Sequence, residues 1–398
     1  MISQYFWPED FPLNDLVKAL VVKGLSVEVV TGQPNYPDGR VFDGYSAGNF
    51  STSRWNGASV HRLPLMPRGP ASALRLILNY LSFVVSGILL APLALRKKKV
   101  DVVFVYAISP ILQAIPAILV KWLKGAKLVI WVQDLWPESL IATGFVHNQW
   151  LLALVRVLVR WIYRRADLIL VQSEAFMAPV STMADAAKIL YYPNSANDVF
   201  SSVPDGECVI LGLDVGFSVV FAGNLGSAQA VETILNAAEL LKDTSAIRVY
   251  LVGSGSRSDW LKDQIKRRGL SNVLLVGRYP LSSMPAIMRN AGALLVTLKD
   301  EAIFRFTVPS KIQTYLAAGR PIVACLNGEG ARIVEQAQAG VSCPAENAVA
   351  LAQSILSVYQ MPDKDRSILG SNGRRYFERN FDSNMLTEKL IGHFEKLR

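Results

Sequence analysis

Short apolar runs alternate with helical stretches along most of this chain, and this alternation restricts the fold more than any other feature. Residues 102–106 (VVFVY), 128–132 (LVIWV) and 168–171 (LILV) are such runs. They are apolar at every position rather than at every second one, which is typical of parallel strands covered by helices on both faces. The pattern therefore predicts an α/β fold built on parallel sheets.

The alternation occurs in two blocks, which suits a chain of 398 residues when a domain commonly has ~100–200. We expect strands at residues 2–5, 27–31, 60–62, 102–106, 128–132, 168–171 and 189–191, and then at 218–222, 249–252, 273–276, 294–297 and 322–325. The blocks join near residues 192–195 and the polar stretch 201–207. We expect an N-terminal domain over 1–198, a C-terminal domain over 199–378 and a last helical segment, 379–398, that packs back on the first domain.

This organisation predicts two Rossmann-like, doubly wound parallel-sheet domains that face a cleft. In such sheets ligands lie beyond the carboxyl ends of the strands. Because 51% of the residues are apolar, intrinsic disorder is excluded. The three cysteines lack C-x-x-C spacing and the three histidines are far apart, so we expect neither a disulfide scaffold nor a metal site.

The net charge of +9 indicates an anionic partner. No nucleic-acid-binding motif accompanies it, so we expect an anionic membrane surface or an anionic substrate and no nucleic acid. Residues 76–95 are apolar enough to span a bilayer and are followed by Arg96–Lys99, but strand-like runs of similar character lie on both sides. We therefore expect a helix lying in the membrane interface, with a buried core helix and a spanning helix as alternatives.

A second helix, at residues 150–165, supports the interfacial interpretation. Arg156, Arg160 and Arg164 form a basic stripe beside apolar faces, although an ordinary solvated helix face would look the same. No basic residues follow Met1 directly, so we do not expect a secretory signal.

Two glycine-containing loops follow strands in the second block, at residues 221–227 (FAGNLGS) and 252–257 (VGSGSR). Glycine lets a backbone approach a ligand closely, and free N–H groups at a following helix stabilise an anion such as a diphosphate. The G-x-G-x-x-G dinucleotide fingerprint is absent, and plain tight turns remain the alternative.

The segment 308–312 (VPSKI) begins a well-signalled helix with proline at its first position, serine as a possible cap, and Gly319 after its last turn. Lys311 then lies at a helix N-terminus, which is unfavourable for a cation. A bound phosphate would remove this conflict, and a solvent-extended side chain is the alternative.

In the first block, residues 131–139 (WVQDLWPES) directly follow a strand and bring carboxylates beside indole rings. Such groups can act as a base, a hydrogen-bond acceptor or a platform for a sugar. Residues 5–10 (YFWPED) and 31–37 (TGQPNYP) are expected at the same edge. Helix capping, core packing and ordinary turn chemistry explain these residues equally well.

Together these segments resemble the retaining GT-B glycosyltransferases of family 4, and the resemblance covers nearly the whole chain. It is carried by residues 3–10 with 14–15, 33–37, 78–82, 131–139, 222–226 and 309–321. The likeness is greatest to bacterial N-acetyl-L-fucosamine transferases of O-antigen and capsule synthesis.

The resemblance implies transfer of a sugar, such as an N-acetylated deoxyhexosamine, from a UDP-sugar to a polyprenyl-diphosphate-linked acceptor at the cytoplasmic face of the inner membrane. It implies no metal or other cofactor, and same-face attack through an oxocarbenium-like state. The implied donor-binding residues are Gly223, Asn224, Gly226, Gly253, Gly255, Arg257, Arg278, Tyr279, Ser310, Lys311 and Thr314, with Arg278 and Tyr279 at the uracil. The implied catalytic residues are Asp134 and Glu138, and the implied acceptor-binding residues are Glu9, Asn35, Tyr36 and Trp136.

The chain departs from the family pattern at the two spaced glutamates that many members carry, where Phe306 and Thr314 stand. The arginine and lysine that often follow the first glycine loop are missing from residues 226–231, and Gln133 or Asp134 replaces a catalytic-loop histidine. Two alternatives stay open, a UDP-sugar 2-epimerase and an inactive membrane-associated scaffold. A pyridine-nucleotide dehydrogenase is disfavoured by the absent fingerprint.

Overall fold

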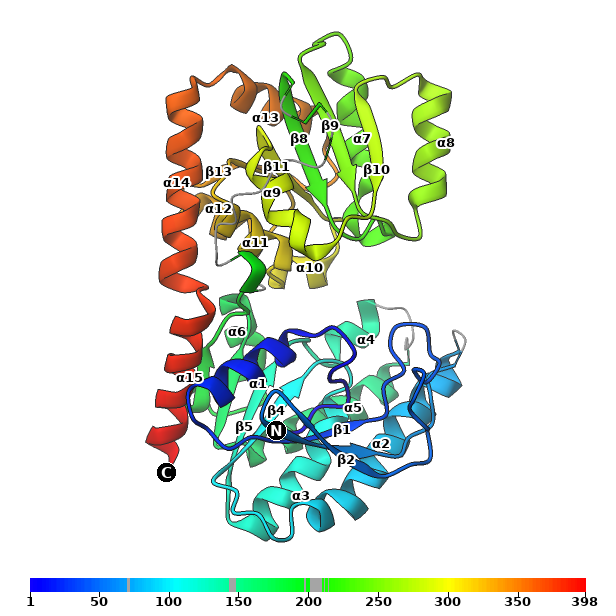
Figure 1. Ribbon diagram of the computed structural model, residues 1–398, viewed down its shortest axis with the longest axis vertical. Coiled ribbons are helices and arrows are strands. Elements are labelled where there is room, and N and C mark those ends of the chain that lie inside the picture. The colour runs from blue at the N-terminus through cyan, green and yellow to red at the C-terminus, as the bar shows by residue number, and fades with distance from the viewer. Residues whose placement is uncertain (70–71, 143–147, 197, 201–209, 211, 214) are drawn as a thin grey trace. The chain divides into compact units, whose positions relative to one another are not determined.

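The computed structural model describes residues 1–69, 72–142, 148–196, 198–200, 210, 212–213 and 215–398, so the polar stretch 201–207 lies outside the described part. The chain forms two compact units (Figure 1). The first comprises Met1–Pro193 with Leu386–Arg398, and the second comprises Asn194–Met385. Compared with the expected boundaries, the first unit ends five residues earlier, at Pro193 rather than 198.

The first unit is built on a mostly parallel sheet. Its strands are β1 (Glu28–Gly32), β2 (Ser51–Trp55), β3 (Ala58–Leu63), β4 (Val102–Ala107), β5 (Lys127–Val132), β6 (Leu168–Val171) and β7 (Ile189–Tyr191). They form the orders β1-β3-β2 and β4-β5-β6-β7, and only β2 pairs antiparallel. Ile2 bridges Val30 and Val105 and so connects the two parts. The strand expected at residues 2–5 is thus reduced to these two bridges.

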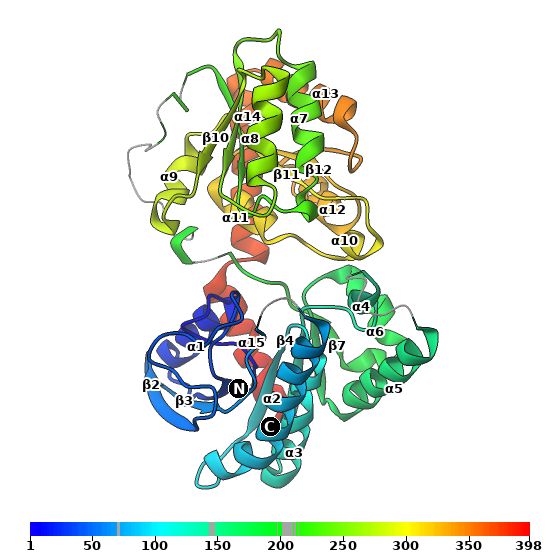
Figure 2. The ribbon, with the colours of Figure 1, turned by 90° about the vertical axis from the view of Figure 1, so that its right-hand side faces the viewer.

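The helices of this unit are α1 (Pro12–Val22), α2 (Ala73–Ala94), α3 (Ala114–Lys124), α4 (Glu138–Ala142), α5 (Gln149–Arg165) and α6 (Met177–Ser181). The last helix, α15 (Ser383–Leu397), returns to this unit, where the Phe394 ring meets the Phe104 ring edge-on at 5.9 Å. Helix α3 packs on β4 and β5 and contacts α5, and α2 packs against α3 (Figure 2).

Helix α2 contains the long apolar stretch. By length and composition alone, Leu74–Ala94 could cross a membrane, and a third of its most apolar window is buried in the fold. The helix joins β3 to β4, two strands of the same unit, and its buried side packs on α3. Its opposite side carries exposed leucine, isoleucine and valine side chains.

The second unit has a six-stranded sheet in the order β10-β9-β8-β11-β12-β13, with every pair parallel. The strands are β8 (Phe217–Ala222), β9 (Ile247–Val252), β10 (Val273–Gly277), β11 (Ala293–Thr297), β12 (Ile322–Cys325) and β13 (Gly340–Cys343). The chain order reverses between β8 and β11, and this switch point is where doubly wound sheets bind ligands.

Helices cover both faces of this sheet. They are α7 (Val231–Leu240), α8 (Ser258–Arg268), α9 (Met284–Arg289), α10 (Ala302–Phe306), α11 (Ser310–Ala318), α12 (Glu329–Gln336), α13 (Ala348–Gln360) and α14 (Asp363–Asn380). One buried apolar cluster contains α11 and Phe377, and a second contains α7 and α13. The predicted α/β class with two Rossmann-like parallel-sheet domains is therefore confirmed, with β2 as its antiparallel exception.

Candidate functional site

A cavity of about 570 Å³ lies at the carboxyl edge of the second unit's sheet, beside the switch point. Eight of the expected donor-binding residues line it: Gly223, Asn224, Gly253, Arg278, Tyr279, Ser310, Lys311 and Thr314. They come from the loops after β8, β9 and β10 and from the first turns of α11. The topology thus gathers residues that are up to 91 positions apart in sequence.

Two glycines allow the β8 and β9 loops to stack against each other. Gly223 and Gly253 have φ angles of 131° and 135°, in the left-handed half of backbone space that side chains disfavour. A Cβ atom on Gly253 would lie 1.9 Å from the Gly223 carbonyl oxygen. Only glycine fits this position, so this part of the cavity wall is bare backbone.

Lys311 supplies a cation beside these loops. Its Nζ donates to Gln229 Oε1 at 2.6 Å and lies 4.9 Å from the Phe221 ring centre. The partner is a neutral amide, and burial lowers the pKa of the Lys311 amine to about 8. Helix α11 begins at Ser310 with Pro309 in the cap position and no side-chain cap, so the expected serine cap is wrong.

Two residues that the sequence did not single out hold this cavity together. The Tyr315 hydroxyl accepts from the Ala222 amide at 3.0 Å and donates to the Ala222 carbonyl at 3.4 Å, which holds the end of β8. Burial raises the pKa of Tyr315, so the hydroxyl stays neutral. Gln229 holds Lys311, and Thr297 at the end of β11 donates to the Gln229 carbonyl.

Three expected donor-binding residues do not line the cavity. Gly226 and Gly255 lie behind it, packed on Asn224, since a Cβ on either would approach the Asn224 side chain within 2.7 Å. The Arg257 guanidinium stacks 3.9 Å from the Trp260 ring centre. Arg257 thus stands at the N-cap of α8 with its guanidinium on the Trp260 ring, and its contact with a donor stays a prediction.

In the first unit, Asp134 is held at the carboxyl edge of β5. Its Oδ2 accepts from the Ser109 backbone amide at 2.9 Å and from the Ser109 hydroxyl at 2.8 Å, and Trp136 Nε1 donates to that hydroxyl at 3.1 Å. Among the described residues, Oδ1 has no hydrogen-bond partner. The carboxylate is thus oriented with one oxygen free to accept a proton or a hydrogen bond.

Glu138 begins α4, and its Oε2 atom is buried without a partner in the described part of the chain. Burial raises the pKa of Tyr163, and the negative charges of Glu138 and Asp134 raise it further. The two carboxylates expected in the catalytic loop thus both lie in the segment that follows β5, Asp134 before α4 and Glu138 at its start.

Glu9 and Asn35 lie inside the loop framework rather than on its surface. The Glu9 carboxylate accepts from the backbone amides of Phe6, Asn35 and Tyr36, and burial raises its pKa against the opposing effect of these bonds. Asn35 donates to Gln33 O and accepts from the Arg68 amide. Both are buried and hold the loop framework, and their direct contact with an acceptor stays a prediction.

Tyr36 is the exposed member of this group, at 39%. The Arg68 guanidinium lies 5.2 Å from its ring centre, and the ring tilts against Phe11 at 5.4 Å. The Trp136 side chain is buried, and its indole N–H donates to the Ser109 hydroxyl. An exposed ring beside hydrogen-bonding groups suits the face of a sugar.

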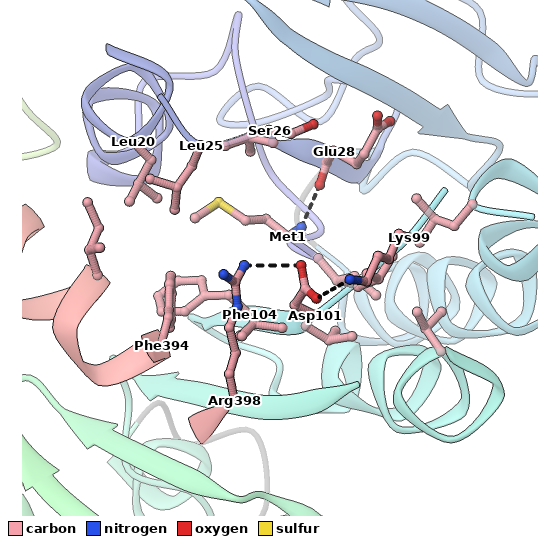
Figure 3. A pocket seen from close by; sticks show the side chains of 18 of the residues that line it. Met1, Leu20, Leu25, Ser26, Glu28, Lys99, Asp101, Phe104, Phe394 and Arg398 are labelled. Carbon is pink, nitrogen blue, oxygen red and sulfur yellow. Dashed lines mark hydrogen bonds and ion pairs between the residues drawn. The ribbon is translucent and has the colours of Figure 1, made fainter. Parts of the chain in front are cut away.

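A different cavity, of about 360 Å³, opens at the amino ends of β1 and β4 (Figure 3). The Met1 amine donates to Glu28 O at 2.5 Å, and burial lowers the pKa of this amine to about 5. Arg398 and Lys99 both pair with Asp101 at its rim. None of the expected site residues lines it.

Two family models match the chain, one in each unit. Residues 13–195 match the family described as Glycosyl transferase 4-like domain, and residues 216–361 match Glycosyl transferases group 1. WbjE of Pseudomonas aeruginosa, named as a probable glycosyltransferase, is 29% identical over 306 residues, 74% of this chain and 74% of WbjE. WcaI of Escherichia coli (strain K12), whose name describes a colanic acid biosynthesis glycosyl transferase, is 28% identical over 319 residues, 77% of this chain and 76% of WcaI.

Solved structures share the architecture. A sucrose-phosphate synthase from Thermosynechococcus elongatus matches with a TM-score of 0.72 at 17% identity, covering 97% of this chain and 92% of that one. Alr3699/HepE from Anabaena, solved in complex with UDP, matches with a TM-score of 0.69 at 14% identity, covering 99% of this chain and 98% of that one. At these identities the likeness is one of fold.

Proposed function

Because the chain is a glycosyltransferase of the family 4 type with the GT-B fold, we propose that it moves a sugar from a UDP-sugar in the second unit to a lipid-linked acceptor at the first. The observation that carries this proposal is the Lys311 ammonium group beside the bare backbone of Gly223 and Gly253. Neither the epimerase nor the inactive scaffold gains support, since the named relatives are glycosyl transferases.

The cavity chemistry supports a nucleoside diphosphate. Backbone N–H groups at the start of α11 and the Lys311 amine are suited to two phosphates, and a volume of about 570 Å³ suits a nucleotide sugar. The UDP named in the HepE structure title agrees with this chemistry. Arg278 and Tyr279 would contact the uracil, and the Thr314 hydroxyl would replace the missing ribose-binding carboxylate.

The proposed reaction retains configuration at the transferred sugar. The bond from the anomeric carbon to the diphosphate oxygen breaks as the acceptor oxygen attacks from the same face, through an oxocarbenium-like state. Lys311 and the backbone N–H groups at the start of α11 stabilise the negative charge that develops on the leaving diphosphate. Asp134 accepts the acceptor's proton or orients a sugar hydroxyl through its free Oδ1. No resident metal or other cofactor is assigned a role in this proposal.

We assign the acceptor to the first unit as a polyprenyl-diphosphate-linked sugar, with Tyr36 and Trp136 near it. The name of WcaI, which refers to colanic acid biosynthesis, supports a role in bacterial polysaccharide assembly such as O-antigen or capsule synthesis. The donor sugar would be an N-acetylated deoxyhexosamine such as L-FucNAc.

A membrane surface is the proposed location, at the cytoplasmic face of the inner membrane without spanning it. Helix α2 exposes a run of large apolar side chains along its outer side, and the sequence Arg96–Lys99 follows its end. Apolar contact and attraction between lysine and anionic lipid are the two forces that hold amphipathic helices in the interface.

The test combines purified protein, UDP-N-acetylhexosamines and bacterial membranes that contain lipid-linked sugar. We expect release of UDP together with transfer of label to the lipid fraction, and UDP protection against thermal unfolding. Lys311→Ala protein serves as the control for the donor site. Absence of turnover with every UDP-HexNAc, together with absence of protection by UDP, would contradict the proposed function.

A further inference from the structure

A separate basic pocket lies in the first unit, where α3 and α5 both end. Its volume is about 450 Å³. Lys121, Lys127, Arg164 and Arg165 line it together with Trp122 and Asp167. These residues are at the amino edge of the sheet, opposite the edge that carries Asp134, because Lys127 begins β5 and Asp167 directly precedes β6.

The basic pocket keeps an excess of positive charge. Its one lining carboxylate, Asp167, uses Oδ2 for Lys121 Nζ at 2.8 Å and for the Leu128 amide at 2.7 Å. Lys121 Nζ also donates to Arg165 O at 2.7 Å, at the C-terminus of α5. A cation is favourable there, so the position of Lys121 needs no ligand to account for it. Lys127 and Arg164 are exposed, and neither pairs with a carboxylate within the ranges that the structure describes. Lys127 lies in β5, so a helix dipole does not account for it.

An apolar stripe on α5 leads to this pocket. It consists of Trp150, Leu154, Val157 and Trp161, all exposed, at spacings that keep them on one side of the helix. Trp150 is 86% exposed. The Arg165 guanidinium lies 5.5 Å from the Trp161 ring centre, so the stripe and the pocket are continuous. At the pocket's own rim, Trp122 is 78% exposed.

We propose that the basic pocket binds the phosphate of an anionic phospholipid headgroup, with the acyl chains of that lipid against the apolar stripe. Two observations favour this occupant. Cations without carboxylate partners match a phosphodiester, and exposed tryptophans beside them match the water–hydrocarbon boundary, where tryptophan concentrates. The inference rests on the proposed membrane association and adds a headgroup site to the apolar contact proposed for α2.

The pocket is tested by removing two of its charges from the full chain. We compare Lys127→Gln/Arg164→Gln protein with a matched pair on α5 outside the pocket lining, Arg156→Gln/Arg160→Gln. The measurement is co-sedimentation with phosphatidylcholine vesicles that contain or lack phosphatidylglycerol. We expect the pocket pair to lose about tenfold in partitioning onto the anionic vesicles and the matched pair to lose less than about threefold. All four substituted side chains are exposed, so we expect unchanged melting temperatures.

A second measurement uses the wild-type protein alone. Calorimetric titration with dihexanoyl phosphatidylglycerol, kept below its micelle concentration, should give saturable binding, and glycerol phosphate should bind more weakly because it lacks acyl chains. Equal losses of vesicle partitioning in the two variant pairs would show that the lipid attracts the basic surface as a whole. That result would overturn the proposed pocket but not the membrane association. Equal affinity for glycerol phosphate would instead assign the pocket to a free phosphate. Failure of wild-type protein to bind anionic vesicles would overturn both, and sugar transfer to a soluble acceptor would show whether the transferase proposal survives.

Discussion

The ammonium group of Lys311 lies 2.6 Å from the amide oxygen of Gln229, beside a cavity that the Gly223 and Gly253 loops help to line. The lysine reaches this position from the first turn of α11, and the glutamine from the loop that follows β8. A cation whose one hydrogen-bond partner among the described residues is a neutral amide can exchange that amide for a phosphate oxygen when a ligand binds.

Lys311→Ala is therefore expected to weaken UDP binding by about 10- to 100-fold, the range for a hydrogen bond to a charged group. Isothermal titration with UDP measures this. Lys262→Ala, an exposed lysine on α8 outside the cavity lining, is the control and should bind as wild type does. Equal affinities for all three proteins would remove Lys311 from the site.

The pH dependence of UDP affinity follows from the same residue. Burial lowers the pKa of Lys311 to about 8, so the amine is charged at pH 7 and neutral at pH 9. Because the diphosphate prefers the charged form, UDP affinity should fall about tenfold between these pH values. Lys311→Gln protein should show a much flatter profile. A wild-type profile as flat as that of the variant would contradict the assignment.

Gly253→Ala should lower both stability and UDP affinity. The new Cβ would meet the Gly223 carbonyl at 1.9 Å at a φ of 135°, so we expect a loss of at least about 2 kcal/mol in the free energy of unfolding. Gly269→Ala is the matched control, since its φ is 61° and no atom lies within 4 Å of the added Cβ. Urea unfolding compares the two. Similar small losses would mean that the loops separate easily and do not form a fixed wall.

Tyr315→Phe removes the hydroxyl that holds the end of β8. The Ala222 amide then loses a buried partner, so the free energy of unfolding should fall by about 1–3 kcal/mol. UDP affinity should fall several-fold because the Gly223 loop is no longer held. Tyr359→Phe, whose hydroxyl makes no hydrogen bond among the described residues, should leave both quantities unchanged.

How far the sequence predicted the fold depends on how strongly each strand is apolar. The fully apolar strands β4, β5 and β6 fall within two residues of their expected ranges. Strand β2, with the sequence STSRW and largely exposed, has no such signal, because its stability comes from pairing with β3 rather than from burial. Strand β13 is short and half-buried and was missed for the same reason.

The candidate site was predictable where a residue's role follows from its place after a strand or at a helix start, as for Gly223, Gly253 and Lys311. Gln229 and Tyr315 were not predictable, because their contacts join positions 82 and 93 residues apart. Glu9 shows a different limit of local patterns. A loop carboxylate can turn outward to a ligand or inward to backbone amides, and no local pattern distinguishes the two.

Asp134→Asn tests the first unit's part in the reaction. The amide cannot take a proton, so the transfer rate should fall by about 10²–10⁴-fold if Asp134 is the base. UDP affinity should not change, because the described residues that line the donor cavity all belong to the second unit. Asp43→Asn, an exposed aspartate of the first unit, is the control. A normal transfer rate in Asp134→Asn protein would leave the proposed base without support.

The most direct test of the central claim is a crystal structure of the protein with bound UDP. We expect the diphosphate to lie against the Gly223 and Gly253 loops with Lys311 Nζ within hydrogen-bond distance of a phosphate oxygen, and the uracil beside Arg278 and Tyr279. Clear density for the nucleotide at any other position, with Lys311 still bound to Gln229, would contradict the account.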